Sequence, residues 1–321
     1  MRLAAKAACI GPFGSALIVA ALAFAGPALA ATNGLKVVNK CKAPVWIQQD
    51  NLPGAAPVVK IDAGQSHDYS VPINGAASTR FWPKLGCDAA GNTCAIGQSS
   101  NPCPKDDKGC APPVDSKLEV TWGCLTGDKT CAKVNPSKPA LLDDNTWLNA
   151  SLVDGFTLPF DVTVMSADQS AGCTTAATCP AVDADKSCPT DVDLSTDGYF
   201  PAYKNQDLRV QGPKGVAGCF SPCGKLTYAK TFGGHQLDPG DPAAAFYCCA
   251  PVSGTNPFKP PLAGLNPGLS PDCNAGPAPK TSYVAYVHKA CSKSVYGFAY
   301  DDAVGLRVCK GATTLTFTLC P

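Results

Sequence analysis

The chain has 321 residues with 26 basic and 25 acidic side chains, so its net charge is close to zero. Lys and Arg are scattered rather than clustered, which argues against a nucleic-acid surface, because binding to phosphates needs gathered basic groups. The sequence also contains 30 Gly and 30 Pro. These residues interrupt helices and mark turns, so we expect strands and loops with little helix.

The first thirty residues are typical of a cleavable signal peptide. Arg2 and Lys6 precede an apolar run over residues 16–25, and the segment ends in the A-x-A pattern Ala28-Leu29-Ala30. The run is shorter than the roughly 20 apolar residues that a membrane span needs, and no later segment reaches that length. We therefore expect a mature chain of residues 31–321 without a membrane span. Its location would be extracytoplasmic: a periplasm, a cell wall or the medium.

Cysteine is the most informative residue type in this chain. One of the 19 cysteines, Cys9, lies in the signal peptide, which leaves an even number between Cys41 and Cys320. In an exported chain an even set of cysteines indicates a disulfide framework rather than metal ligands or free thiols.

Short runs of β-branched and aromatic residues predict the strands of a sandwich or barrel. They cover residues 35–39, 44–48, 67–71, 79–82, 118–122, 149–153, 160–164 and 314–319. Between Cys173 and Cys273 such runs become rare, while cysteine, proline and glycine gather. We therefore expect a sandwich core from about 31–165 plus 280–321, and a disulfide-rich loop region over about 166–279.

Several sequence blocks follow one another in a characteristic order. They are Val37-Val38-Asn39-Lys40-Cys41, Pro44-Val45-Trp46, Arg80-Phe81-Trp82 with Gly86-Cys87, Ser151-Leu152-Val153-Asp154-Gly155-Phe156 with Pro159, Cys188-Pro189, Tyr247-Cys248-Cys249, and Tyr296-Gly297-Phe298-Ala299-Tyr300-Asp301-Asp302 with a Cys320-Pro321 end. Together they resemble the thaumatin-like proteins, the family of thaumatin, osmotin and zeamatin. The resemblance covers nearly the whole mature chain and implies a mainly β fold, a flattened β-sandwich beside disulfide-rich loops.

The resemblance also implies a pairing for sixteen of the cysteines. The implied pairs are Cys41–Cys320, Cys87–Cys94, Cys103–Cys110, Cys173–Cys309, Cys179–Cys291, Cys188–Cys219, Cys223–Cys248 and Cys249–Cys273. Cys124 and Cys131 lie in an insertion, residues 123–145, that the family pattern lacks. Their close spacing predicts a ninth, local bridge.

Many members of this family carry an acidic cleft that is linked to β-1,3-glucan binding and sometimes to its hydrolysis. Carried over to this sequence, the cleft residues are Arg80, Glu119, Asn149, Asp154 and Asp301. Glu119 is the single Glu of the chain, and Asn149 stands where the family has Asp. In a hydrolase, Glu119 and Asp154 would be the catalytic pair. The missing carboxylate weakens the repulsion that raises a neighbour's pKa, which favours binding over efficient hydrolysis.

Each of these residues also has a purely structural interpretation. Asp154 and Asp301 lie in turn-like sequences, where Asp302 is an alternative to Asp301, and Arg80 can serve as the partner of a nearby acidic group. Four aromatic residues could stack on sugars, although aromatic residues of a sandwich more often belong to the core: Trp122, Trp147, Tyr199 and Tyr203.

The leading hypothesis is a secreted, monomeric, antifungal or defence-type protein that binds β-1,3-glucan or a related wall polysaccharide. The first alternative is a protein-binding or structural scaffold, which the 123–145 insertion and Asn149 favour, whereas Arg80, Glu119, Asp154 and Asp301 favour the cleft. The second is a weak endo-β-1,3-glucanase. The histidines show no metal-ligand spacing, and no motif indicates a metal or other cofactor.

Overall fold

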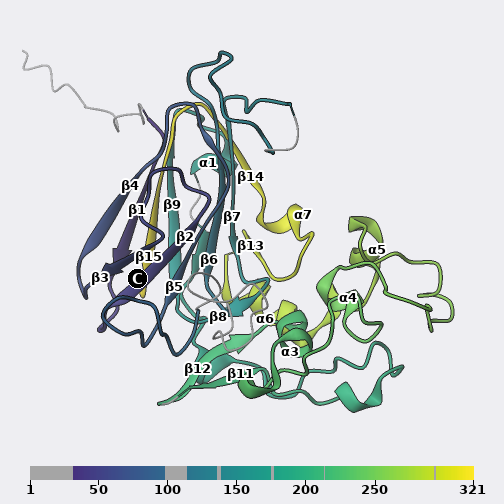
Figure 1. Ribbon diagram of the computed structural model, residues 1–321. Coiled ribbons are helices and arrows are strands. Elements are labelled where there is room, and N and C mark those ends of the chain that lie inside the picture. The colour runs from purple at the N-terminus through teal and green to yellow at the C-terminus, as the bar shows by residue number, and fades with distance from the viewer. Residues whose placement is uncertain (1–31, 98–113, 136–138, 175–176, 213, 293) are drawn as a thin grey trace, which may run out of the picture.

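The structure is a computed structural model that describes residues 32–97, 114–135, 139–174, 177–212, 214–292 and 294–321. Within these residues the protein is mainly β, and two sheets form a sandwich beside a loop-rich region with short helices (Figure 1). The described part of the chain contains no helix with the length and apolar character that crossing a membrane requires.

The first sheet joins the two ends of the described chain. Its strands run in the order β10 (Ala177–Cys179), β9 (Phe160–Ser166), β15 (Thr313–Leu319), β1 (Gly34–Asn39) and β4 (Ser66–Ser70). β1 and β15 pair in parallel, with Val37 opposite Phe317, while the other pairs are antiparallel. Alternate residues of β15 are buried, as expected for a strand with one face on a core.

The second sheet carries the candidate site. Its order is β13 (Val295–Tyr296), β7 (Asn145–Ser151), β6 (Lys117–Trp122), β5 (Ala76–Lys84), β2 (Val45–Asp50) and β3 (Val58–Ile61), and β14 (Arg307–Lys310) also pairs with β7. Tyr69 of the first sheet meets Phe81 of the second edge-on, with ring centroids 5.1 Å apart. This contact belongs to the core that the two sheets enclose.

A small third sheet lies below the sandwich in Figure 1 and begins the loop-rich region. It consists of β11 (Arg209–Gly212), β12 (Gly215–Phe220) and β8 (Gly155–Phe156). A Cβ at Gly155 would come within 2.1 Å of the Cys219 carbonyl oxygen, and its φ is +119°. Glycine is required here, because only it combines this conformation with so close an approach of two backbones.

The helices are short, in agreement with the prediction of little helix. They are α1 (Ala171–Thr174), α2 (Ala184–Ser187), α3 (Pro222–Thr227), α4 (Ala245–Cys248), α5 (Ser270–Ala275), α6 (Ser282–Ala290) and α7 (Asp302–Gly305), with 3-10 turns at Pro201–Tyr203, Lys230–Phe232 and Ala278–Lys280. α6 was not recognised from the sequence. It begins where the Thr281 hydroxyl accepts from the Val284 N–H, and it buries Tyr283, Val284 and Val287 at helical spacing.

Each of the eight predicted strands overlaps a strand of the structure. The largest difference is β7, which begins at Asn145 and ends at Ser151, so the prediction of 149–153 started late and ran into a turn. β3, β8 and β10 to β14 were missed. These strands have two to six residues and too little alternation to stand out from loops.

Eight disulfides link the described residues. They are Cys41–Cys320, Cys87–Cys94, Cys124–Cys131, Cys173–Cys309, Cys179–Cys291, Cys188–Cys219, Cys223–Cys248 and Cys249–Cys273. These are the same partners as those expected above, and the remaining expected pair, Cys103–Cys110, lies outside the described residues.

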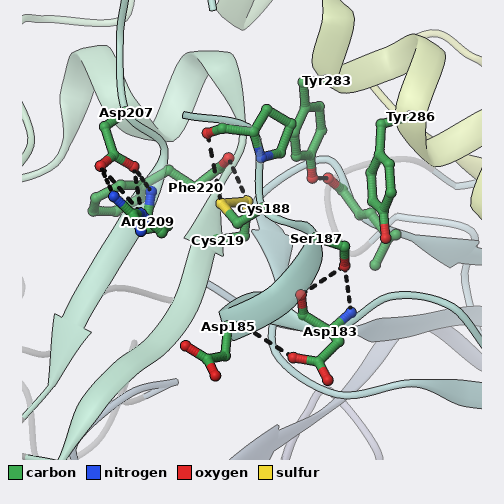
Figure 2. Close-up of a disulfide and its surroundings, with 12 residues drawn as sticks. Asp183, Asp185, Ser187, Cys188, Asp207, Arg209, Cys219, Phe220, Tyr283 and Tyr286 are labelled. Carbon is green, nitrogen blue, oxygen red and sulfur yellow. Dashed lines mark hydrogen bonds and ion pairs between the residues drawn. A yellow bond between two sulfur atoms is a disulfide. The ribbon is translucent and has the colours of Figure 1, made fainter. Parts of the chain in front are cut away.

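Figure 2 shows how one of these bonds is embedded. Cys188–Cys219 links the segment after α2 to β12. Asp183 caps α2 by accepting from two backbone N–H groups. Arg209, which lies opposite Cys219 on β11, forms a hydrogen-bonded ion pair with Asp207. In the same region the Tyr286 hydroxyl donates to the Ala181 carbonyl, at 2.8 Å. The loop region is therefore tied to its surroundings by polar contacts as well as by disulfides.

Candidate functional site

Three of the predicted cleft residues form a row across neighbouring strands. The strand register places Arg80 of β5 opposite Glu119 of β6, and Glu119 opposite Asn149 of β7. Leu118 and Val120, on either side of Glu119, are buried in the core. Because side chains alternate between the two faces of a strand, Glu119 and its two partners project from the outer face of the sheet.

The side chains of this row bond to one another. Arg80 and Glu119 form an ion pair with 3.1 Å between Nε and Oε1, and Asn149 Nδ2 donates a hydrogen bond to Glu119 Oε2 over 3.0 Å. The side chains of Arg80 and Glu119 are 52% and 28% exposed. The ion pair is therefore well hydrated, and it fixes the direction of the carboxylate more than it stabilises the fold.

The row lies in an open pocket of about 210 Å³, which we call the Glu119 pocket. Its other lining residues are Ser78, Thr79, Val120, Thr121, Trp147 and Leu306. Trp147 is 43% exposed, which is unusual for so large an apolar side chain. The pocket thus combines an exposed aromatic ring with a charged pair and an amide.

Asp154 is not in the lining of this pocket. Its carboxylate accepts a hydrogen bond from the Lys117 ammonium, whose other acidic neighbour is Asp115, at 3.6 Å. Asp115 is 1% exposed and neither of its oxygens has a hydrogen-bond partner. Burial raises the pKa of Asp115 to about 8, although Lys117 opposes the shift. The two nearby carboxylates keep the pKa of Lys117 above its usual value despite its burial.

Asp301 is also held away from the pocket lining. Its carboxylate is buried, with 5% of the side chain exposed, and Oδ2 lies 2.7 Å from His288 Nε2 and 2.8 Å from the Gly297 N–H that donates to it. The neighbouring Asp302 is exposed and accepts from the Tyr296 hydroxyl. Burial and this hydrogen bond raise the pKa of Tyr296, and the charge of Glu119 adds to the effect. Of the two aspartates, Asp302 is therefore exposed to solvent, and Asp301 anchors the backbone.

The four candidate aromatic residues have different environments. Trp122 is fully buried and its indole N–H donates to Thr79 Oγ1. Tyr199 packs edge-on against Phe258, and Tyr203 packs against His235. Only Trp147, among these four, lines the Glu119 pocket.

Ser78, Thr121 and Leu306 are pocket residues that sequence reasoning did not select. Thr121 could have been found from the alternation of β6, since it lies two residues after Glu119 on the same face. Leu306 could not, because it follows α7 and comes to the pocket from a distant part of the sequence. Among the described residues no group of three or more His, Cys, Asp or Glu side chains could hold a metal ion.

The fold and its disulfides agree with what sequence comparison shows. Residues 39–250 match the sequence model of the Thaumatin family, which is more than half of the chain, and the chain belongs to this family. A glucan endo-1,3-beta-glucosidase from Prunus avium is 29% identical over 314 residues, with 92% of this chain and 93% of that protein covered. The pathogenesis-related thaumatin-like protein 3.5 from Cryptomeria japonica is 24% identical over 295 residues, with 89% and 88% covered.

Solved structures match only loosely. The thaumatin-like xylanase inhibitor TLXI covers 40% of this chain and 75% of its own, at 19% identity and a TM-score of 0.27. The family assignment therefore rests on the sequence.

Proposed function

We propose that the protein acts outside the cytoplasm and binds β-1,3-glucan or a related wall polysaccharide in the Glu119 pocket. The observation that carries this proposal is the row of Arg80, Glu119 and Asn149 beside the exposed ring of Trp147. Charged and amide groups can exchange hydrogen bonds with sugar hydroxyls, while an aromatic face covers the apolar face of a sugar ring. Ligand pockets commonly combine an apolar surface with a few convergent polar groups.

Two further observations support the proposal. The relative from Prunus avium is named for an activity on 1,3-β-linked glucan, which favours that class of polysaccharide as the ligand. The eight disulfides among the described residues are typical of proteins that work in oxidising surroundings, such as the outside of a cell.

The arrangement of carboxylates favours binding over hydrolysis. Glycoside hydrolysis uses two carboxyl groups about 5 Å apart for retention, or about 6.5–9.5 Å apart for inversion. Glu119 is the single carboxylate among the described residues that line the pocket; its Oε1 is paired with the Arg80 guanidinium and its Oε2 accepts from the Asn149 amide. Asp154, the other half of the expected catalytic pair, is engaged by Lys117.

The test is a pull-down of the oxidised mature protein on insoluble β-1,3-glucan. We expect Trp147→Ala and Glu119→Gln each to weaken binding about tenfold, which corresponds to about 1.4 kcal/mol of binding free energy. The matched controls are Met165→Ala, which removes a side chain that is 49% exposed on the first sheet, and Asp62→Asn, which removes an exposed ion pair with Lys60. Both controls should bind as the parent does.

Three other outcomes would change the assignment. Binding that survives both pocket substitutions would place the glucan site elsewhere. A parent that does not bind glucan would favour the protein-binding alternative. If the parent released sugar from the glucan and Glu119→Gln did not, the glucanase alternative would be favoured.

A further inference from the structure

Beside the Glu119 pocket lies a second hollow of about 440 Å³, which we call the Val134 hollow. It is lined by Asn51, Pro53, Gly75, Ala76, Ala77, Ser78, Ala132, Lys133, Val134 and Asn135. Ser78 lines both hollows. Both hollows are lined by residues of β5, so the two lie next to one another along a single strand.

The Glu119 pocket is small for a site that binds a polymer. Its volume of about 210 Å³ lies below the range of about 300–1,000 Å³ that is usual for ligand pockets. The Val134 hollow has about twice that volume, and together the two fall within the range. A polymeric ligand with one unit in the Glu119 pocket would extend beyond this pocket. The Val134 hollow, which borders the pocket at Ser78, is one place where the next units could lie.

The junction between the two hollows is held in place. Ser78 lies at a β-bulge with φ of +55°, where its backbone N–H donates to Thr121 Oγ1 and its carbonyl accepts from Asn51 Nδ2. Because both backbone groups are bonded, the bulge keeps a defined shape. Its position is therefore set by β6 on one side and by the turn after β2 on the other.

The far wall of the Val134 hollow comes from the insertion, and it is fastened to the sandwich. The Ala132 N–H donates to the Asn74 carbonyl over 2.8 Å, and Asn74 Nδ2 donates to the Thr130 carbonyl over 3.1 Å. The Cys124–Cys131 disulfide closes the loop directly before Ala132. Val134 remains 45% exposed on this wall, although the backbone that carries it is fixed.

The lining chemistry fits a neutral sugar. Ala77 and Val134 offer a small apolar surface, while Asn51 and Lys133 add polar groups to the lining. Such a surface can cover the apolar face of a sugar ring and leave its hydroxyls to the polar side chains, as in other ligand pockets.

Because the two hollows share Ser78 in their linings, we infer that residues 132–135 form a second saccharide subsite, which binds further units of a glucan chain whose other units occupy the Glu119 pocket. This inference rests on the proposed function. The subsite makes the protein selective for chain length: a long β-1,3-glucan touches both hollows, whereas a short oligosaccharide fills one. Affinity gained by joining two sites on one ligand exceeds that of either site alone.

Calorimetric titration of the oxidised mature protein tests this inference, with laminaritriose as the short ligand and a long soluble β-1,3-glucan as the other. We expect the parent to bind the long chain more tightly than the short one. Val134→Asp should weaken binding of the long chain about tenfold and leave that of the short one unchanged. Because Val134 is exposed, the substitution should not impair folding.

The matched control is Leu141→Asp. Leu141 belongs to the same insertion and is 42% exposed, but it lines a different hollow. The Leu141→Asp variant should therefore bind both ligands as tightly as the parent does. Three outcomes would overturn the subsite and leave the proposed function standing. The parent could bind long and short glucan equally well, Val134→Asp could keep full affinity for the long chain, or Val134→Asp could lose affinity for both ligands equally. A parent that binds neither glucan would overturn the proposed function and the subsite with it.

Discussion

At the scale of single residues, Asn149 explains the character of the site. An Asp at this position would set a second carboxylate against Glu119 Oε2, where the amide N–H now donates. Like charges directly opposite one another on neighbouring strands are destabilising, whereas the Asn149 amide bonds Glu119 without adding charge. Asn149 thus allows Glu119 to lie between the Arg80 guanidinium and a neutral amide donor.

We predict that Asn149→Asp lowers the free energy of unfolding by about 1 kcal/mol at pH 7. Repulsion raises the pKa of one carboxyl of the new pair above its unfolded value, so the folded variant gains a proton as the pH falls. The loss of stability is therefore greatest above this raised pKa and shrinks as the pH drops through it. Guanidinium unfolding at pH 7 and at pH 4 measures the difference.

The control for this prediction is Asn149→Ala, which removes the same donor but adds no charge. Its loss of stability should change much less between the two pH values. If the loss of unfolding free energy changed with pH by the same amount in both variants, the repulsion argument would be contradicted.

At the scale of elements, α7 and the segment before it form one side of the site. Asp301 bonds both His288 of α6 and the Gly297 N–H, and Leu306, directly after α7, lines the Glu119 pocket. The position of Leu306 therefore depends on a buried carboxylate that does not itself line the pocket. This arrangement separates the role of Asp301 from that of Glu119.

We predict that Asp301→Ala lowers the free energy of unfolding by about 1–3 kcal/mol, because it leaves two donors without their acceptor. Glucan binding should weaken only modestly, through the displacement of Leu306. Asp301→Asn, which retains an acceptor for the Gly297 N–H, should be less destabilising. Denaturant unfolding and the glucan pull-down give the two readings. Full stability together with abolished binding would instead make Asp301 a ligand-contacting residue.

At the scale of the whole molecule, disulfides join parts of the chain that are far apart in sequence. Cys41–Cys320 spans 279 residues and closes the parallel pair of β1 and β15, while Cys124–Cys131 spans 7 and closes a local loop. The chain-entropy model attributes more stabilisation to the longer loop, because the longer loop restricts the unfolded chain more. The two bonds therefore offer a matched comparison.

We predict that Cys41→Ala with Cys320→Ala lowers the free energy of unfolding by about 5 kcal/mol, and Cys124→Ala with Cys131→Ala by about 2–3 kcal/mol. Guanidinium unfolding of the oxidised variants tests the ranking. Equal losses in the two variants would show that local strain or residual denatured-state structure outweighs loop entropy.

Much of the architecture could be predicted from the sequence. Buried and more exposed residues alternate in β1, β6, β9 and β15, because each of these strands has one face on the core. This pattern is visible in the sequence of each strand, so these strands could be predicted without knowing their neighbours. Short strands such as β13 carry no such pattern. The sequence of α6 contains several Val and Tyr residues, which are common in strands, so this helix was not predicted. Close spacing predicted the Cys124–Cys131 pair, but the other disulfide partners could be predicted only through the family resemblance, since cysteine positions alone leave many pairings open.

The sequence by itself determined the residue types of the site, including its single Glu and the neutral amide of Asn149. The tertiary structure decided which of them meet. Strand register aligned Arg80, Glu119 and Asn149, while the packing of more distant segments paired Asp154 with Lys117 and Asp301 with His288. The physical reason is that pairing between strands is a long-range contact, and the order of residues along one strand does not specify its neighbours.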